Sequence, residues 1–274
     1  MTRTSTLPPD YHCHTHLCKH AEGEPIDYAR AALAKGITEI ACTEHAPAPE
    51  PFTPGIRMAL DEFPLYCEWV EAARALEGIT VLLGIEADYY DGCEAFLEEW
   101  LDTHPFDYVL GSVHFLRYER ERDHAVTPIW TGDDPASTWA AYFARIQLLV
   151  KTGLYDVVAH LDLPKRFGPA PDPQIVEAVV KPALDAIADA QMGIEINTSG
   201  FIHGPSEPYP SLSILTWANE RGIPISFGSD SHQPERMGGH FEQAVKLAEM
   251  AGYQQRASYR QRQRVMHPLT EAPD

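Results

Sequence analysis

The sequence predicts an α/β fold in which seven strand–helix units form a closed or nearly closed parallel barrel. Short apolar runs alternate with longer amphipathic ones along the 274 residues, and this alternation is typical of a parallel sheet. The apolar runs are nearly continuous, as expected for strands that helices cover on both faces. The chain carries no dinucleotide-binding glycine fingerprint, which disfavours an open doubly wound sheet. No linker divides residues 1–274, so we expect one domain with short flexible ends at about 1–8 and 270–274.

The first half of the chain is expected to supply four strands and three helices. Pro25 and Gly36 are well placed to begin and end the first helix. The long, proline-rich connection 46–55 is typical of a lid or a binding loop. The expected elements are strands at 10–14, 37–45, 79–89 and 106–115, and helices at 25–36, 61–78 and 93–104.

The second half repeats the pattern with three further strands and four helices. Pro182 predicts a bend or a break in the helix that contains it. A second long connection spans 117–135, and the basic run 256–264 is expected to be a solvated tail strand or helix. The expected elements are helices at 134–153, 172–193, 211–222 and 241–252, and strands at 155–163, 194–200 and 223–232.

The composition limits the class of partner. Hydrophobic residues make up 44% of the chain, enough for a sizeable core. The 40 acidic residues against 21 basic ones give a formal charge of -19, and this field repels nucleic acid. The same surplus suits a protein that holds several divalent cations. We therefore expect a small-molecule partner and no nucleic acid, and the sequence is silent on oligomeric state.

Cysteine usage and hydropathy predict a cytoplasmic protein. The five cysteines form no CxxC pair, and their number is odd, so a disulfide framework is not expected. No apolar stretch approaches 18 residues, and the first ten residues lack the apolar core of a signal peptide. We expect no membrane association.

Polar side chains that bind metals stand at the end of every expected strand. His12 and His14 lie two residues apart on the first strand and therefore point to the same face. The carboxyl ends of barrel strands form the mouth where active sites are built, so these residues converge there: His12, His14, Glu44, His45, Glu86, His114, His160, Asp162, Glu195, Asn197, Asp230 and His232.

This donor set predicts more than one transition-metal ion. A single zinc ion takes only three or four protein ligands, and imidazole mixed with carboxylate, without thiolate, favours zinc, iron or manganese. A carboxylate can bridge two ions where imidazole cannot, and Glu86, central in the strand order, is the natural bridge. Paired metals are typical of phosphate-ester hydrolysis.

The motifs resemble a known superfamily. "HCHTH…CKH", "TEH", "GIEAD", "GSVHF", "HLDLPKRFG", "EINTSG" and "FGSDSH" are similar, in this order and over about residues 10–270, to the polymerase and histidinol phosphatase (PHP) superfamily. Within it the chain most resembles the monofunctional histidinol-phosphate phosphatases. The resemblance implies a distorted seven-stranded TIM-like barrel with a trinuclear centre of divalent transition metals.

The resemblance also implies a ligand for each metal position. The resemblance assigns Glu86 as a ligand of two ions and His16 as a residue that binds none. The first metal would take His12, His14, Glu86 and Asp230, the second Glu86, His114 and His160, and the third His20, His45 and His232.

Substrate-binding and catalytic roles follow from the same motifs. Arg166 resembles the phosphate-binding arginine of the family, and a planar guanidinium suits a phosphate. Asp162 is either a general acid for the leaving alkoxide or the residue that orients His160. Asn197 is a further substrate contact. The stretch after "NTSG" departs from the family, since Ile202 stands where a basic residue is usual, and His203 is the candidate replacement. Lys165 is expected to be solvated.

The resemblance implies that the chain is an enzyme, a metal-dependent phosphomonoesterase. It would hydrolyse L-histidinol phosphate, a small phosphorylated amino alcohol of histidine biosynthesis. The alternative within the superfamily is a phosphoesterase for a nucleotide or another small phosphate ester. An amidohydrolase barrel is disfavoured because no expected strand ends in the bridging lysine of that class. A module that binds metal without turnover is a further alternative.

Overall fold

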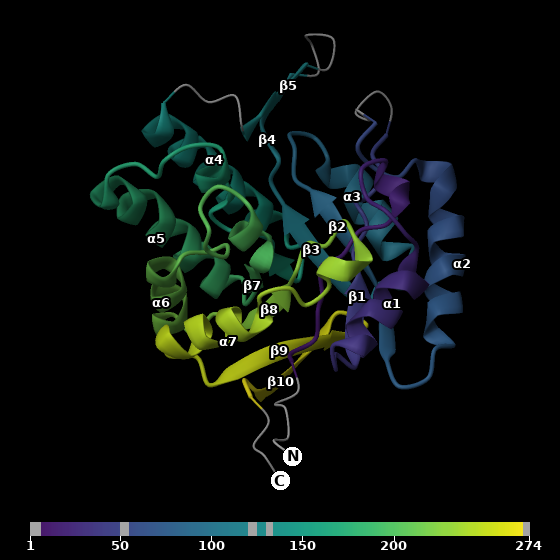
Figure 1. Cartoon of the computed structure of the whole chain (residues 1–274). Helices are drawn as coiled ribbons and strands as arrows, with labels where there is room; N and C mark the ends of the chain where they lie inside the picture. Colours follow the sequence, from purple (N-terminus) through teal and green to yellow (C-terminus); the bar gives the residue numbers. More distant parts are fainter. Residues whose placement is uncertain (1–6, 50–54, 120–124, 130–133, 271–274) are drawn as a thin grey trace.

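The computed structural model describes residues 7–49, 55–119, 125–129 and 134–270. The predicted flexible ends therefore lie largely outside the described residues. Helices surround a curled parallel sheet, with α1 and α2 on one side and α4, α5 and α6 on the other (Figure 1). The α-helices are α1 (Pro25–Ala34), α2 (Phe63–Arg74), α3 (Glu94–Asp102), α4 (Pro135–Thr152), α5 (Pro173–Asp189), α6 (Leu212–Glu220) and α7 (Phe241–Met250).

The sheet has six parallel strands in the order β1-β2-β3-β6-β7-β8. All residues of β3, β7 and β8 are buried, which explains why the sequence shows continuous apolar runs there. This confirms the α/β class and the parallel sheet. The strands are β1 (Glu39–Cys42), β2 (Thr80–Asp88), β3 (Tyr108–Ser112), β6 (Val157–Val158), β7 (Gly193–Asn197) and β8 (Ile225–Gly228).

The segment 10–14 lies between the two edge strands of this sheet. The amide of Ala41 donates to the carbonyl of Asp10, and the amide of Tyr11 donates to the carbonyl of Phe227. Only isolated bridges join the segment to its neighbours, at Asp10–Ile40 and Cys13–Ser231. A regular seventh strand is therefore not confirmed, although the segment connects β1 to β8 where that strand was expected.

Several helices follow their sequence signals closely. Asp134 caps α4 by accepting a hydrogen bond from the amide of Ser137 at 2.8 Å, and Pro135 occupies the first turn. Pro182 lies inside α5, yet the helix is assigned without interruption from Pro173 to Asp189. The helix is therefore not broken at Pro182, and a bend there stays a prediction.

Two antiparallel hairpins were not predicted as such. The first, β4 (Phe115–Glu119) with β5 (Ala125–Pro128), occupies part of the long connection 117–135. The second pairs β9 (Gln255–Arg260) with β10 (Gln263–Pro268). Tyr259 of β9 is buried against Tyr108, with ring centroids 4.9 Å apart, so the basic run is not simply a solvated tail.

Candidate metal centre

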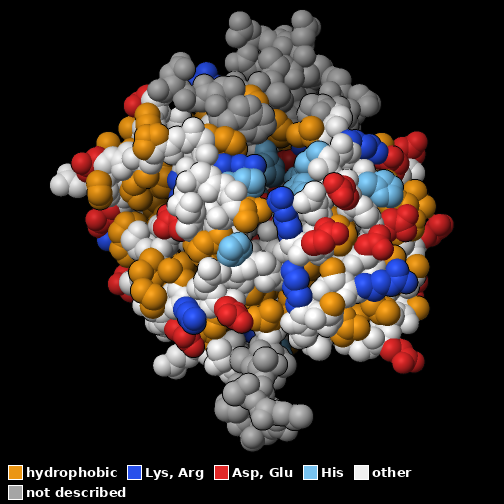
Figure 2. Space-filling view, in the orientation of Figure 1, with side chains coloured by type: hydrophobic (Ala, Val, Ile, Leu, Met, Phe, Trp, Pro, Cys, Tyr) orange, Lys and Arg blue, Asp and Glu red, His pale blue; other side chains and the backbone are white. Residues whose placement is uncertain are grey.

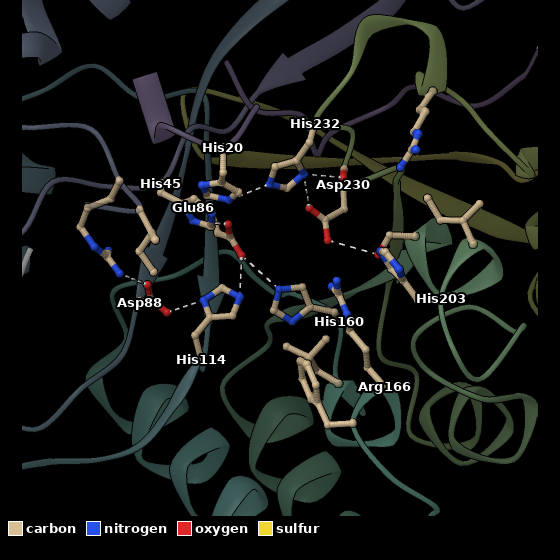
Figure 3. A pocket seen from close by; sticks show the side chains of 17 residues that line it. His20, His45, Glu86, Asp88, His114, His160, Arg166, His203, Asp230 and His232 are labelled. Carbon is tan, nitrogen blue, oxygen red and sulfur yellow. Dashed lines mark hydrogen bonds and ion pairs between the residues drawn. The ribbon is translucent and has the colours of Figure 1, made fainter. Parts of the chain in front are cut away.

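A cavity of about 380 Å³ opens at the carboxyl ends of the strands. Histidine side chains gather in a hollow on this face, and Lys or Arg side chains lie at its border (Figure 2). The floor consists of predicted metal ligands, and Figure 3 shows several of them pointing into one space. The predicted ligands that line the cavity are His20, His45, Glu86, His114, His160, Asp230 and His232.

His12 and His14 lie next to this cavity, fully buried. The Nε2 atoms of the two rings are 3.1 Å apart. The Nε2 atom of His14 lies 3.3 Å from Oδ1 of Asp230 and 3.6 Å from Oε2 of Glu86. The side chains expected for the first metal are therefore gathered around one point.

Glu86 lies between the other groups, and each of its oxygens faces imidazoles. Its Oε1 atom lies 3.1 Å from Nε2 of His160 and 3.9 Å from Nε2 of His114. Its Oε2 atom lies 2.8 Å from Nδ1 of His45. Burial raises the pKa of this carboxyl, but His45, His12 and His160 outweigh that effect and hold the pKa well below its ordinary value. An ionised carboxylate in this position suits a ligand shared between two cations.

His20 and His232 form the third group, with their Nε2 atoms 3.0 Å apart. The rings of His20 and His45 stack with centroids 5.4 Å apart. His45 also belongs to groups of possible ligands with His14 and His232 and with Glu86 and His114. The structure thus brings His45 near more than one predicted metal position.

Oxygen acceptors hold the Nδ1 atoms of four predicted ligand rings. Nδ1 of His12 lies 2.7 Å from Oε1 of Glu195, and Nδ1 of His114 lies 2.6 Å from Oδ1 of Asp88. Nδ1 of His20 lies 2.8 Å from the Cys18 carbonyl, and Nδ1 of His232 lies 3.0 Å from the Asp230 carbonyl. Nδ1 of His14 lies 3.5 Å from Oε1 of Glu44 and makes no hydrogen bond among the described residues. An ionised carboxylate or a carbonyl can only accept, so Nδ1 carries the proton in the first four rings.

This tautomer leaves the Nε2 lone pairs of His20 and His232 facing each other. In the neutral rings neither Nε2 atom of this pair can donate to the other. Two Zn–N bonds of about 2.05 Å at a tetrahedral angle place their nitrogens about 3.3 Å apart, close to the observed 3.1 and 3.0 Å. Burial lowers the pKa of His45 to about 4 and of His232 to about 3, so both are neutral at pH 7. The residues therefore fit bound transition metals.

Several residues around the ligands were missed or given no role from the sequence. Glu195 and Asp88 hold ligand rings, and Asp88 is itself bonded to Nη2 of Arg57 at 2.6 Å. Cys18, which is buried, lies close enough to His20 and His232 to be a possible ligand, a thiol that was not expected at the centre from the sequence. Its only sequence signal is the short "CKH" spacing.

His16 lies outside the cluster, as expected for a non-ligand. It is exposed, and its ring lies 4.8 Å from that of Trp69. Its Nδ1 atom lies 3.2 Å from the carbonyl of Gly23. The contacts of His16 are therefore with residues other than the predicted metal ligands.

The predicted catalytic and substrate residues fall into two groups. Arg166 and His203 line the cavity, and Figure 3 shows both on the same side of it. Asn197 does not line it, because its side-chain amide is buried and bonded to Glu195 and Ser199. Ser199 lines the cavity in its place. A substrate contact by Asn197 stays a prediction that this geometry does not favour.

Asp162 is fully buried beside Lys165 rather than beside the His160 ring. Its Oδ2 atom lies 2.9 Å from Nζ of Lys165 and accepts the Ser211 amide at 3.0 Å. Its Oδ1 atom has no partner, and no hydrogen bond joins it to His160 among the described residues. The orienting role is thus unsupported, while the general-acid role remains open. The expected solvation of Lys165 is wrong, because its side chain is only 6% exposed.

The chain belongs to the PHP family, whose domain model matches residues 10–199. A probable histidinol-phosphatase of Deinococcus radiodurans is 38% identical over 239 residues, covering 86% of this chain and 91% of the relative. A histidinol-phosphatase of Lactococcus lactis is 26% identical, covering 91% of this chain and 93% of the relative. These relatives agree with the resemblance drawn from the motifs.

Two solved structures share the fold. One is histidinol phosphate phosphatase from Lactococcus lactis in complex with zinc, L-histidinol and phosphate, with a TM-score of 0.80 and 24% identity, covering 94% of this chain and 98% of that one. The other is a protein of Listeria monocytogenes described as a histidinol phosphatase, with a TM-score of 0.77 and 21% identity, covering 86% and 99%. No helix in the described part of this chain is long and apolar enough to cross a membrane.

Proposed function

We propose that the chain is a metal-dependent phosphomonoesterase that hydrolyses L-histidinol phosphate to L-histidinol and phosphate. The observation that carries the proposal is the convergence of imidazole and carboxylate ligands on a cavity whose rim bears Arg166. The names of the relatives from Deinococcus and Lactococcus give the substrate. The cavity volume of about 380 Å³ is of the size that small-molecule sites have.

The ligands are proposed to hold three divalent transition-metal ions, each zinc, iron or manganese. The first would be bound by His12, His14, Glu86 and Asp230, the second by Glu86, His114 and His160, and the third by His20, His45 and His232, an assignment that comes from the family resemblance and overlaps only in part with the possible ligand groups of the structure. When bound, such ions generate hydroxide from water near neutral pH and neutralise phosphoryl oxygens. Glu86 is proposed to act in catalysis by bridging two of them.

The remaining groups at the cavity would position the substrate. Arg166 would donate hydrogen bonds to the phosphoryl group, because a guanidinium matches two phosphate oxygens at once. Asp162 is the proposed acid for the leaving alkoxide, although it is buried beside Lys165 and does not line the cavity. Ile56 and Phe167, which also line the cavity, offer an apolar wall for an imidazole ring.

Several aromatic and acidic residues of the loops around the mouth either do not line the cavity or lie outside the described residues. Phe52 and the side chain of Tyr118 are not described, and Phe115 and Tyr209 are buried away from the cavity lining. Glu207 is bonded to Lys165 at 2.9 Å. Specificity is therefore proposed to depend on the residues that line the cavity.

One observation favours the second candidate, a phosphoesterase with another small substrate. Each carboxylate among the described lining residues, Glu86, Asp88 and Asp230, already faces an imidazole or a guanidinium. None is left for the ammonium group of histidinol phosphate. Relatives named only as probable phosphatases, from Aeromonas hydrophila and Escherichia coli, are 27% and 26% identical.

The deciding experiment compares kcat/KM for histidinol phosphate, a nucleoside monophosphate and p-nitrophenyl phosphate with the same metal-loaded enzyme. We expect histidinol phosphate to be preferred at least about tenfold, which is about 1.4 kcal/mol of transition-state binding. If another ester is equal or better, the specific assignment is wrong and only a general phosphoesterase remains. If no ester is hydrolysed, the enzymatic proposal itself is wrong.

A further inference from the structure

Three arginines of the described residues line the cavity, and they differ in how their charge is balanced. Arg57 is buried and bonded to Asp88 at 2.6 Å and to the carbonyl of Ala46 at 3.1 Å. Arg166 and Arg236 have no carboxylate within ion-pair distance anywhere in the described part of the chain. Two uncompensated guanidinium groups at the mouth of one cavity create a positive field there, which attracts an anion.

The backbone that carries Arg166 is firmly held. Arg166 ends the short 3₁₀ helix Leu163–Arg166, whose other residues are buried. The neighbouring Lys165 is bonded through Nζ to Glu207 at 2.9 Å and to the carbonyl of Pro208 at 2.7 Å. These bonds fix the start of the Arg166 side chain while leaving its guanidinium at the cavity.

The backbone that carries Arg236 is held in the same way. Nζ of Lys35 donates to the carbonyls of Glu235 and Met237 at 2.6 and 2.7 Å. The amide of Gly238 donates to Oδ2 of the fully buried Asp10 at 2.8 Å, and Met237 is buried. Because the turn is fixed on both sides, binding of an anion by its exposed arginine costs side-chain entropy but little backbone entropy.

His203 lies close to both arginines. Its pKa is lowered by partial burial first, and then by the charges of Arg166 and Arg236. The ring is therefore neutral at pH 7, and it is a weaker anion contact than the arginines beside it. The sequence-based choice of His203 to replace the missing basic residue at Ile202 is thus poorly supported.

We propose that Arg236 is a second phosphoryl-binding residue, which together with Arg166 clamps the phosphoryl oxygens that face away from the metal ligands. This inference rests on the proposed function, because it assumes a phosphate ester in this cavity. Each guanidinium would donate two parallel hydrogen bonds to the phosphoryl group from a different element, the turn after β6 or the turn after β8. The clamp would favour dianionic monoesters over neutral or singly charged analogues.

The test compares Arg236→Gln with the wild-type metal-loaded enzyme, using inorganic phosphate as the probe. We expect the inhibition constant of phosphate and the KM of the best monoester to rise roughly tenfold to a hundredfold, the range for loss of one charge-assisted hydrogen bond. Metal content should stay unchanged, because Arg236 touches no predicted ligand. Arg236→Lys should recover part of the affinity.

Arg221→Gln is the matched control, since that guanidinium is bonded to Asp185 at 2.7 Å and does not line the cavity. It should leave both constants unchanged. An unchanged inhibition constant in Arg236→Gln would overturn the inference. If the wild-type enzyme hydrolyses no monoester, the proposed function fails, but calorimetric titration with phosphate still decides on the clamp. Equal affinity in wild type and variant would reject it, and weaker binding in the variant would support it.

Discussion

Glu195 binds His12 at the ring nitrogen that is not the predicted metal ligand. Oε1 of the carboxylate lies 2.7 Å from Nδ1 of the imidazole, and both side chains are buried. The other oxygen of Glu195 accepts the amide of His160 and the side-chain amide of Asn197, both at 3.0 Å. One carboxylate on β7 therefore fixes the tautomer of one predicted ligand and the backbone of another. Such partners of metal-binding histidines commonly change metal affinity 10- to 100-fold.

Replacing Glu195 by glutamine should weaken metal binding by about 10- to 100-fold. The neutral amide removes the charge that keeps the proton on Nδ1 of His12, and its NH2 group can face the ring instead. Metal affinity would be measured by competition with a chelator, and activity at saturating metal would be measured in parallel. Glu249→Gln is the control because Glu249 is exposed on α7. Equal affinity in the two variants would show that Glu195 does not act on the centre.

Replacing Gly228 by alanine should disturb the contact between Glu195 and His12, because Gly228 packs against both side chains. An added Cβ atom would lie 1.9 Å from Oε1 of Glu195 and 2.6 Å from Cβ of His12, so one of them must move. Overpacking of this kind costs about 1–3 kcal/mol, which lowers Tm by roughly 2–4 °C per kcal/mol in a chain of this size. Gly168→Ala, where an added Cβ meets no atom within 4 Å, is the control. A Tm equal to that of the control would contradict the packing described for β8.

Replacing Glu86 by glutamine should lower activity by orders of magnitude and reduce metal content. Glu86 faces His45 through one oxygen and His160 through the other, so the amide removes a charge from two predicted metal positions at once. Phosphate release and elemental analysis of the same preparation would check this. Near-normal turnover together with full metal content would show that Glu86 is not a bridge.

The sequence predicted which side chains gather at the cavity because strand ends in a parallel sheet meet at one edge. His12, Glu86 and His160 could be assigned to the same mouth from that topology alone. The residues that bind Nδ1 of these rings could not be predicted in this way, because a contact such as that of Glu195 with His12 depends on side-chain packing between residues 183 positions apart. Lys165 was misjudged in part for the same reason, since its partners Glu207 and Pro208 are 42 and 43 residues away, although a third partner, Asp162, is only three residues away.

The errors in the fold have local causes. The segment 10–14 has the apolar and histidine pattern of a strand but forms only isolated bridges with its neighbours. The charged stretch after Phe115 was interpreted as a loop because its hairpin lacks a long apolar run. In β9 a signal was present, since Ala257 and Tyr259 alternate with polar residues and are the buried positions. The arginines in 256–264 led to the prediction of a solvated segment instead.

The most direct test of the account is the number of metal ions per chain, measured by elemental analysis of protein purified without chelator. The account predicts close to three zinc, iron or manganese ions at full occupancy, because imidazole and carboxylate groups around Glu86 form several overlapping sets of possible ligands. Reconstitution with manganese or zinc should bring a partly loaded preparation to the same number. At most one ion per chain after reconstitution would contradict the trinuclear centre.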